Sequence, residues 1–372
     1  MDTEARDQAY MRQALDLAAR GLGRVEPNPM VGALVVRDDR VIAEGWHGRF
    51  GGPHAEVVAI AQAGDRCRGA ELFVTLEPCC HHGKTPPCTN AILRAGIRRV
   101  VAAVGDPFPQ VSGRGEALLR GAGLEVKVGV LADEARRLNA AYFKRQLTGL
   151  PLVIAKWAMT ADGRIATATG ESRWISCEAS RRRVHEVRRI VDAVLVGAGT
   201  VVKDSPSLTV RHVEPLPERG QPTRVVLDEA LAIDPQREPA ASARQVPLIV
   251  YAALDAPPAR AEALRRAGCE VVHAPAEGRF VSPRHVLEDL GRRGMSRVRI
   301  EGGAHVFGSF LGAGLVDRAM IFISPRILGS AGGLGPVAGP SERGLEAALA
   351  LEDLTVERID TDILMQGRLG EF

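Results

Sequence analysis

The chain has 372 residues, of which 45% are hydrophobic and 25% charged, the composition of an ordinary globular protein of about two domains. Its formal net charge of +3 is small for this length and disfavours a protein that wraps duplex nucleic acid. The first residues are polar, and no run approaches the roughly 18 apolar residues of a membrane span, so we expect neither a secretory signal nor a membrane protein.

The first half alternates helical and strand patterns, which predicts an α/β domain. The expected helices are residues 5–20, 54–64, 88–95, 115–120 and 133–145. The expected strands are residues 33–36, 41–43, 70–76, 99–104 and 124–128. Turn residues at 148–151 then predict a boundary between one domain at 1–148 and a second at 149–372.

The second half repeats this alternation. The expected strands are residues 152–158, 193–197, 224–227, 247–251, 270–273, 297–300, 319–323 and 354–359. The expected helices are residues 178–190, 258–267 and 283–293, with another after residues 301–309. Residues 203–222 are irregular and contain prolines, and residues 234–247 are expected to be a loop.

The cysteines indicate a metal site in preference to a disulfide framework. The chain has only six, and three of them crowd into residues 79–88. Such clustering in a long chain is typical of metal binding in a reducing compartment, so we expect a cytoplasmic protein.

Residues 54–88 carry the clearest chemical signal. The imidazole of His54 and the thiols of Cys79 and Cys88 are an adequate set of three zinc ligands that leaves a fourth position open for water. Glu56 follows two residues after the histidine and is placed to carry protons for that water. A His-x-Glu followed by Pro-Cys and a later cysteine is the signature of zinc nucleobase deaminases, so the sequence predicts a deaminase site.

A structural zinc is the plain alternative, with His81 or His82 as a fourth ligand, but it leaves Glu56 without a purpose. Cys79 is the expected ligand because it directly follows Pro78 at the end of a strand, whereas Cys80 would point elsewhere.

The loop between the two ligand thiols is basic and stiffened by prolines, which suits an anionic substrate such as a sugar phosphate. Lys84 lies in this loop and could bind such a substrate; alternatively, it is only a solvated surface lysine. Asn28 stands between two prolines and can present its amide to a base or a sugar hydroxyl, although Asn-Pro is also a common turn. His47 follows a strand and is expected at the same rim.

Two glycine-rich turns in the second half, at residues 196–200 and 301–309, each follow a strand. Glycines there let backbone N–H groups approach a phosphate at a helix N-terminus. Neither turn has the G-x-G-x-x-G spacing, yet two of them in one domain favour dinucleotide binding. The arginines of residues 178–189 would otherwise form only a solvated basic face.

Together the two halves resemble one family, the bifunctional deaminase–reductases of bacterial riboflavin biosynthesis, over essentially the whole chain. In the first half the resemblance rests on NPMVG (28–32), HAE (54–56), TLEPC (75–79), TPPC (85–88), DP (106–107) and VSGRG (111–115). In the second half it rests on Lys156, DG (162–163), GESRWI (170–175), GAGT (197–200), DSPSLT (204–209) and EGG (301–303).

The resemblance implies a cytidine-deaminase-like three-layer α/β domain followed by a dihydrofolate-reductase-like α/β domain. The first would use zinc to deaminate 2,5-diamino-6-ribosylamino-4(3H)-pyrimidinone 5′-phosphate, with Glu56 passing the proton of water to the leaving ammonia. The second would use NADPH to reduce the ribosyl chain, which gives 5-amino-6-(5-phosphoribitylamino)uracil. The partner would be this small phosphorylated pyrimidine and no nucleic acid or membrane, and we expect a homo-oligomer.

By position, the resemblance also implies the ligand contacts. The deaminase substrate would be held by Asn28, His47 and Lys84, with Lys84 at its phosphate. The cofactor would be contacted by Ala158, Trp174, Thr200, Asp204 and Gly303. The reductase substrate would be contacted by Ser172, Arg188, Leu208, Arg211 and Glu301, with Arg188 and Arg211 pairing with phosphate.

Two other functions fit parts of the sequence. A deaminase of nucleic-acid bases with an RNA-binding C-terminal domain keeps the zinc chemistry, but it needs an aromatic or basic single-strand surface, and only 4% of the residues are aromatic. A zinc-stabilised binding module without turnover leaves Glu56 and Lys84 unexplained.

Overall fold

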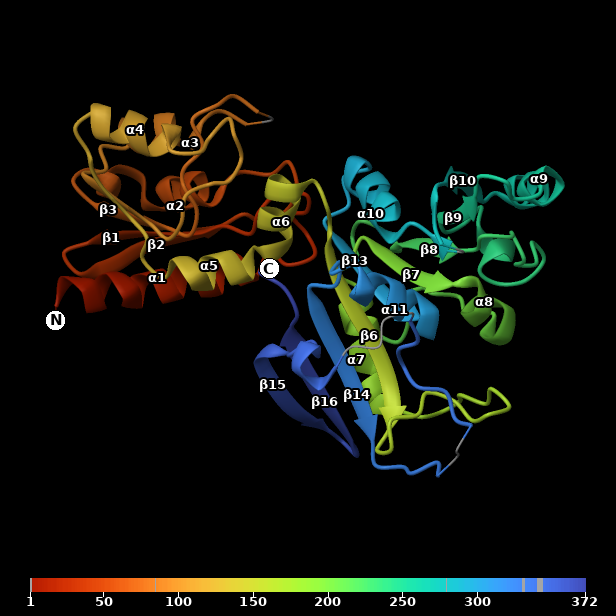
Figure 1. Ribbon diagram of the computed structural model, residues 1–372. Coiled ribbons are helices and arrows are strands. Elements are labelled where there is room, and N and C mark those ends of the chain that lie inside the picture. Colours follow the sequence, from red (N-terminus) through yellow and green to blue (C-terminus); the bar gives the residue numbers. More distant parts are fainter. Residues whose placement is uncertain (1, 84, 279, 330–331, 340–343) are drawn as a thin grey trace. The chain divides into compact units, whose positions relative to one another are not determined.

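The computed structural model describes residues 2–83, 85–278, 280–329, 332–339 and 344–372. The chain forms two compact units, Met1–Thr148 and Gly149–Phe372 (Figure 1). Lys84, one of the expected substrate ligands, lies outside the described residues. Within the described ranges, no helix has both the length and the apolar character needed to cross a membrane.

The first unit is built on a five-stranded sheet in the order β2-β1-β3-β4-β5. Its strands are β1 (Gly32–Arg37), β2 (Arg40–Trp46), β3 (Glu71–Val74), β4 (Arg99–Ala102) and β5 (Glu125–Val128). Strand β1 runs antiparallel to both neighbours, whereas β3, β4 and β5 are parallel. The residues of β3 and β4 are all buried, as expected for central parallel strands covered on both faces.

Helices cover both faces of this sheet and give the three layers (Figure 1). One face carries α2 (Ala55–Ala63), α3 (Cys88–Arg94) and α4 (Arg114–Gly121), with the short 3₁₀ turn η1 (Gly64–Cys67) after α2. The other face carries α1 (Thr3–Ala19) and α5 (Ala132–Leu138), and α6 (Ala140–Thr148) ends the unit.

The single helix expected at residues 133–145 is wrong, because the segment forms two helices that meet at Asn139. The Asn139 side chain is buried, accepts a hydrogen bond from the backbone N–H of Met30 at 2.8 Å and donates one to the Met30 carbonyl at 2.9 Å. This tertiary pairing competes with the helical backbone pattern, as asparagine side chains commonly do. It also fixes the loop that holds Asn28.

The second unit contains a nine-stranded sheet in the order β10-β9-β8-β7-β13-β6-β14-β16-β15. Its strands are β6 (Leu152–Thr160), β7 (Ala193–Gly197), β8 (Thr223–Leu227), β9 (Leu248–Ala253), β10 (Glu270–Ala274), β13 (Arg297–Gly302), β14 (Arg318–Ser324), β15 (Glu352–Ile359) and β16 (Asp362–Arg368). All pairs are parallel up to β14, and β16 and β15 then add an antiparallel hairpin.

Side chains of the central strands feed two apolar cores, one on each face of the sheet. In β7, Leu195 belongs to one core, while its neighbours Val194 and Val196 belong to the other, which follows the two-residue period of a strand. The helices of this unit are α7 (Glu178–Arg188), α8 (Ala198–Asp204), α9 (Pro258–Ala267), α10 (Pro283–Arg292) and α11 (Ala304–Gly312). The remaining short elements are β11 (Ala276–Glu277), β12 (Phe280–Val281), η2 (Ala240–Ser242) and η3 (Leu345–Ala347).

Several elements of this unit differ from the sequence expectation, among them β16, α8 and η2. Strand β16 was not expected, because residue type does not follow burial along it: Asp362 is polar but buried, whereas Ile363 is apolar but 44% exposed. Helix α8 continues to Asp204, so the irregular stretch begins later than residue 203. The expected loop at residues 234–247 contains the single turn η2.

Candidate active sites

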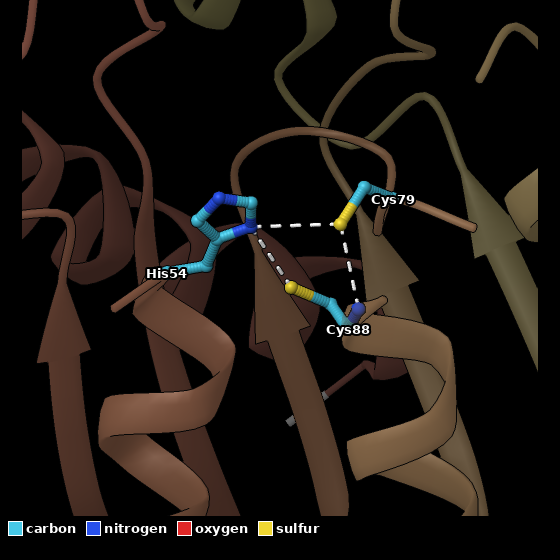
Figure 2. Close-up of side chains that lie close together, drawn as sticks. All are labelled: His54, Cys79 and Cys88. Carbon is cyan, nitrogen blue, oxygen red and sulfur yellow. Dashed lines mark hydrogen bonds between the residues drawn. The ribbon is translucent and has the colours of Figure 1, made fainter. Parts of the chain in front are cut away.

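Three potential metal ligands of the first unit come together at helix and strand ends. His54 is the N-cap of α2, Cys88 is the first residue of α3, and Cys79 follows β3. Their side chains point toward one another (Figure 2), with one nitrogen and two sulfur atoms all within 4.8 Å. His54 Nδ1 lies 3.1 Å from Cys88 Sγ and 3.5 Å from Cys79 Sγ.

These atoms fit a zinc ion. Tetrahedral bonds of about 2.0–2.3 Å place ligand atoms roughly 3.5–3.8 Å apart, close to the distances found here. Hydrogen bonds from Cys88 and His54 hold the pKa of the Cys79 thiol below its usual range, which favours the thiolate that a metal requires. Cys80 points away and donates its thiol to the Gln110 carbonyl at 3.6 Å. The structure therefore places Cys79 in the trio and leaves Cys80 out of it.

Glu56 lies in the first turn of α2, two residues beyond His54. Its side chain is only 3% exposed and lines the same cavity as His54 and Cys79. Burial raises the pKa of this carboxyl above its ordinary value, against the opposing effect of His54. A carboxyl with a raised pKa can both take and return a proton near neutral pH.

Asn28 and His47 form a pair on the wall of this cavity of about 300 Å³. His47 Nδ1 lies 3.0 Å from the Pro53 carbonyl, and its Nε2 lies 3.2 Å from the Asn28 amide nitrogen. Burial lowers the pKa of His47, so we assign the neutral ring that donates from Nδ1 and accepts at Nε2. Asn28 then has its carbonyl oxygen left to offer a ligand.

The loop between the thiols also contributes to the cavity. Thr85 Oγ1 lies 3.3 Å from His54 Nε2, where it orients the ring whose other nitrogen faces the thiols. His81 lines the cavity and stands edge-on to Phe108 with ring centroids 5.5 Å apart. His82 is exposed and does not line the cavity, so neither histidine belongs to the trio.

Sequence reasoning missed the part played by Glu77. Its carboxylate accepts four backbone N–H groups, from Asp106, Gly113, Gly115 and Glu116, at 2.9–3.2 Å. A side chain at Gly115 would collide with the Pro78 carbonyl, since a Cβ there would lie 2.1 Å from that oxygen. The N-terminus of α4 is thus clamped against the segment that carries Cys79.

A second missed group is Asp106, which follows β4. Its carboxyl is 7% exposed and lines the cavity together with Tyr142 of α6. Asp106 Oδ1 accepts hydrogen bonds from the Tyr142 hydroxyl at 2.8 Å and from the Phe108 N–H at 2.9 Å. Burial raises the pKa of Asp106 to about 6. The sequence could have indicated both Glu77 and Asp106 as site residues, because each follows the carboxyl end of a parallel strand.

The second unit contains a larger cavity of about 1890 Å³. Every residue expected at the cofactor or at the reductase substrate lines it: Ala158, Ser172, Trp174, Arg188, Thr200, Asp204, Leu208, Arg211, Glu301 and Gly303. Gly303, between β13 and α11, has φ of +98°, a backbone conformation that favours glycine. The turn therefore brings the N-terminus of α11 to the cavity.

Glu301 is the centre of a buried charge cluster in this cavity. Its carboxylate accepts hydrogen bonds from Arg188 Nε at 2.7 Å and from Arg299 Nε at 2.9 Å. Burial alone would raise the pKa of Glu301, but the two guanidinium groups outweigh it and hold that pKa well below its usual range. Arg188 also donates to the Thr209 carbonyl at 2.8 Å. Its guanidinium is thus largely engaged by the protein, and the expected pairing of Arg188 with phosphate stays a prediction.

Other lining residues are positioned by cation–π contacts and by the loop after α8. The Trp174 ring, 59% exposed, has the guanidinium carbon of Arg181 4.6 Å from its centroid. Leu208 is buried with φ of +55°, a costly conformation for leucine. The backbone N–H of Arg211 donates to His185 Nδ1 at 3.1 Å. Burial lowers the pKa of Lys156, on β6 in the cavity wall, to about 8.

The fold and the two sites define a class of protein, a zinc-dependent deaminase domain joined in one chain to a reductase domain. Residues 4–104 match the family model described as the cytidine and deoxycytidylate deaminase zinc-binding region. Residues 151–365 match the RibD C-terminal domain. This second match contradicts the alternative hypothesis of an RNA-binding C-terminal domain.

Whole-chain relatives extend the match. The chain is 41% identical to the riboflavin biosynthesis protein RibD of Aquifex aeolicus, over 96% of this chain and 97% of the relative. It is 39% identical to the RibD protein of Escherichia coli, over 87% and 89%. The chain belongs to the RibD family, the bifunctional deaminase–reductases of riboflavin biosynthesis.

Solved structures agree with this assignment. A structure of Acinetobacter baumannii RibD matches with a TM-score of 0.87 at 34% identity, covering 99% of this chain and 100% of that one. The diaminohydroxyphosphoribosylaminopyrimidine deaminase/5-amino-6-(5-phosphoribosylamino)uracil reductase of Thermotoga maritima matches with a TM-score of 0.84 at 39% identity, covering 99% of each chain. The expected family, fold class, double activity and use of zinc and NADPH are confirmed.

Proposed function

We propose that Met1–Thr148 is the deaminase domain and that it removes the 2-amino group of 2,5-diamino-6-ribosylamino-4(3H)-pyrimidinone 5′-phosphate. The observation that carries this proposal is the trio of His54, Cys79 and Cys88 with the buried Glu56 in the same small cavity. The Thermotoga relative, named for a deaminase of such a pyrimidine, supports the choice of substrate.

His54, Cys79 and Cys88 would hold the zinc, which when bound makes water acidic enough to act as a nucleophile near neutral pH. Glu56 takes the proton of that water and returns it to the departing amine. The buried, neutral His47 fixes the Asn28 amide, whose free oxygen can accept a hydrogen bond from the base. Lys84 is the proposed partner of the phosphate.

We propose that Gly149–Phe372 reduces the ribosyl chain of the deaminated product with NADPH. Ala158, Trp174, Thr200, Asp204 and Gly303 are the proposed cofactor contacts. The glycine turn at Gly303 supports a phosphate at the N-terminus of α11, because helix N-termini present free N–H groups and a partial positive charge. The dinucleotide supplies the hydride, and the protein orients the opened sugar toward it.

Ser172, Arg188, Leu208, Arg211 and Glu301 are the proposed contacts on the substrate side. Arg188 is already bound to Glu301 and Thr209, which supports a role in shaping the cavity. Arg211 has no carboxylate partner among the described residues, so we assign it the substrate phosphate.

The decisive experiment supplies purified protein with the diaminopyrimidine phosphate and NADPH. Ammonia should appear first, and NADPH absorbance should fall only after it. NADPH oxidation that precedes ammonia release, or ammonia release with no oxidation afterwards, would contradict the two-step assignment. A saturating concentration of NADPH, but not RNA, should also raise the melting temperature of the reductase domain, by an amount that corresponds to about 2.7 kcal/mol at a hundredfold excess over Kd.

Two further expectations stay predictions. A homo-oligomer would give a light-scattering mass that is a multiple of the 39.8 kDa chain mass. A cytoplasmic location would be seen by cell fractionation.

A further inference from the structure

Two buried carboxyls that line the deaminase cavity, Glu77 and Asp106, are not used by the reaction described above, and Glu77 is already satisfied by four backbone N–H groups. Asp106 is 7% exposed and lies on the cavity wall that also contains Tyr142. Its two oxygens differ. Oδ1 accepts hydrogen bonds from the Tyr142 hydroxyl and from the Phe108 N–H, whereas Oδ2 receives none from the part of the chain that the structure describes.

Oδ2 is nevertheless not sealed inside the protein. Asp106 keeps 7% of its surface accessible and lines the cavity, which is the open space beside its side chain. Contacts within the protein explain the position of Oδ1 but not that of Oδ2. The turn to Phe108 and the bond from Tyr142 both use Oδ1, and an asparagine would serve both without the cost of burying an ionisable group.

A ligand in this cavity would supply what Oδ2 lacks. A cavity of about 300 Å³ lies at the small end of ligand pockets, which suits a single pyrimidine ring. The proposed pyrimidine carries N–H donors at its ring nitrogen and exocyclic amino groups, and each donor that is buried without an acceptor costs about 1–3 kcal/mol. Asn28 and His47, which line the same cavity, together offer only the one amide oxygen of Asn28.

We propose that Asp106 is a substrate-binding residue whose Oδ2 accepts a hydrogen bond from an N–H of the pyrimidine, and that Tyr142 is a positioning residue that fixes the carboxyl by holding Oδ1. The proposal rests on the deaminase function proposed above and adds a residue that recognises the pyrimidine base. Tyr142 belongs to α6, so the last helix of the unit helps to shape the active site.

The test compares Asp106→Asn with the wild-type chain. Asparagine keeps the Oδ1 turn and replaces Oδ2 with an amide that donates. We expect kcat/KM for ammonia release to fall about 10- to 100-fold, mainly through KM, because the lost bond is one to a charged group. Bound zinc, the melting temperature of the deaminase domain and NADPH oxidation with the deaminated product should be unchanged. Asp65→Asn, an exposed aspartate outside the cavity, is the matched control.

Tyr142→Phe should lower kcat/KM less than Asp106→Asn does, and the double variant should lose no more than Asp106→Asn alone, since Tyr142 acts through that carboxyl. Tyr10→Phe removes a hydroxyl outside the cavity and is the control. The proposal is overturned if Asp106→Asn deaminates normally, if its loss comes with lost zinc or a lower melting temperature, or if the two substitutions act independently. Wild-type protein that releases no ammonia would instead overturn the proposed function.

Discussion

The two sites of this chain differ in how they are assembled. The zinc trio comes from one stretch of 35 residues, at the start of two helices and the end of one strand, around a cavity of about 300 Å³. The reductase cavity of about 1890 Å³ is lined by residues from Lys156 to Asp360, drawn from many strands and loops. A compact metal site needs few neighbours, whereas a dinucleotide and a sugar phosphate need a long surface.

The sites also use carboxyl groups in opposite ways. In the deaminase cavity, burial raises the pKa of Glu56 above its ordinary value and that of Asp106 to about 6, so the surroundings disfavour the charged form of both carboxyls. In the reductase cavity, Arg188 and Arg299 keep the pKa of Glu301 low, so this carboxylate is a fixed charge in the absence of ligands. Environment, and not residue type, decides which behaviour a carboxyl has.

The largest expected effect comes from removing a proposed zinc ligand, which tests whether deamination requires the metal. Cys79→Ser should abolish bound zinc and ammonia release, because a hydroxyl is a poor zinc ligand and only His54 and Cys88 remain. Cys80→Ser, at the next residue, should keep both, since the Cys80 thiol points to the Gln110 carbonyl. Zinc content by atomic absorption and an ammonia assay decide the matter. A loss of zinc in the Cys80 variant would instead assign that sulfur to the metal.

The second test separates proton transfer from metal binding. Glu56→Gln should retain zinc and lower kcat for deamination about 10²- to 10⁴-fold, the usual contribution of a positioned acid–base group. NADPH oxidation with the deaminated product should stay normal, because that site lies in the other unit. Glu44→Gln, an exposed glutamate of β2, is the control. Normal turnover by the Glu56 variant would remove this residue from the mechanism.

The third test asks whether the Glu301 cluster stabilises the reductase domain. Glu301→Gln leaves two buried guanidinium groups without their carboxylate and should cost about 3–5 kcal/mol of unfolding free energy in that domain. Glu357→Gln breaks the exposed pair with Arg183 and should cost at most about 1 kcal/mol. Calorimetry can resolve the two domains. Equal losses of unfolding free energy in the two variants would show that the buried cluster stabilises the domain no more than an exposed ion pair does.

The smallest effect concerns pH. The pKa of Lys156 is lowered to about 8 in the folded protein, against about 10.4 in an unfolded chain. Between about pH 8 and 10 the unfolded chain therefore binds more protons, and Lys156 makes the reductase domain more stable as pH rises. Lys156→Met should be more stable than the wild type below about pH 8, with a gap that narrows toward pH 10.

Urea midpoints measured across this range test that prediction. Lys203→Met removes another lysine that lines the same cavity and is the matched control. A constant gap between the Lys156 variant and the wild type would mean that the lysine is not desolvated in the folded state.

The sequence was sufficient wherever chemistry depended on short spacing. His54, Cys79 and Cys88 were predicted as zinc ligands, and Glu56 as a proton carrier, because these residue types form a recognisable set within a short stretch. The structure brings the three predicted ligands together. The helices and strands were also mostly evident from apolar periodicity. The break at Asn139 was not, because its cause is a pair of hydrogen bonds to Met30, 109 residues away in the chain.

By itself, then, the sequence determined the α/β alternation, the proposed set of zinc ligands and the family to which the chain belongs. Tertiary structure alone decided that Arg188 binds Glu301, 113 residues away, and that Tyr142 holds Asp106, 36 residues away. The physical reason is that a buried ionisable group is governed by the neighbours that enclose it. Strand order and helix packing bring those neighbours together, and no local pattern in the sequence records them.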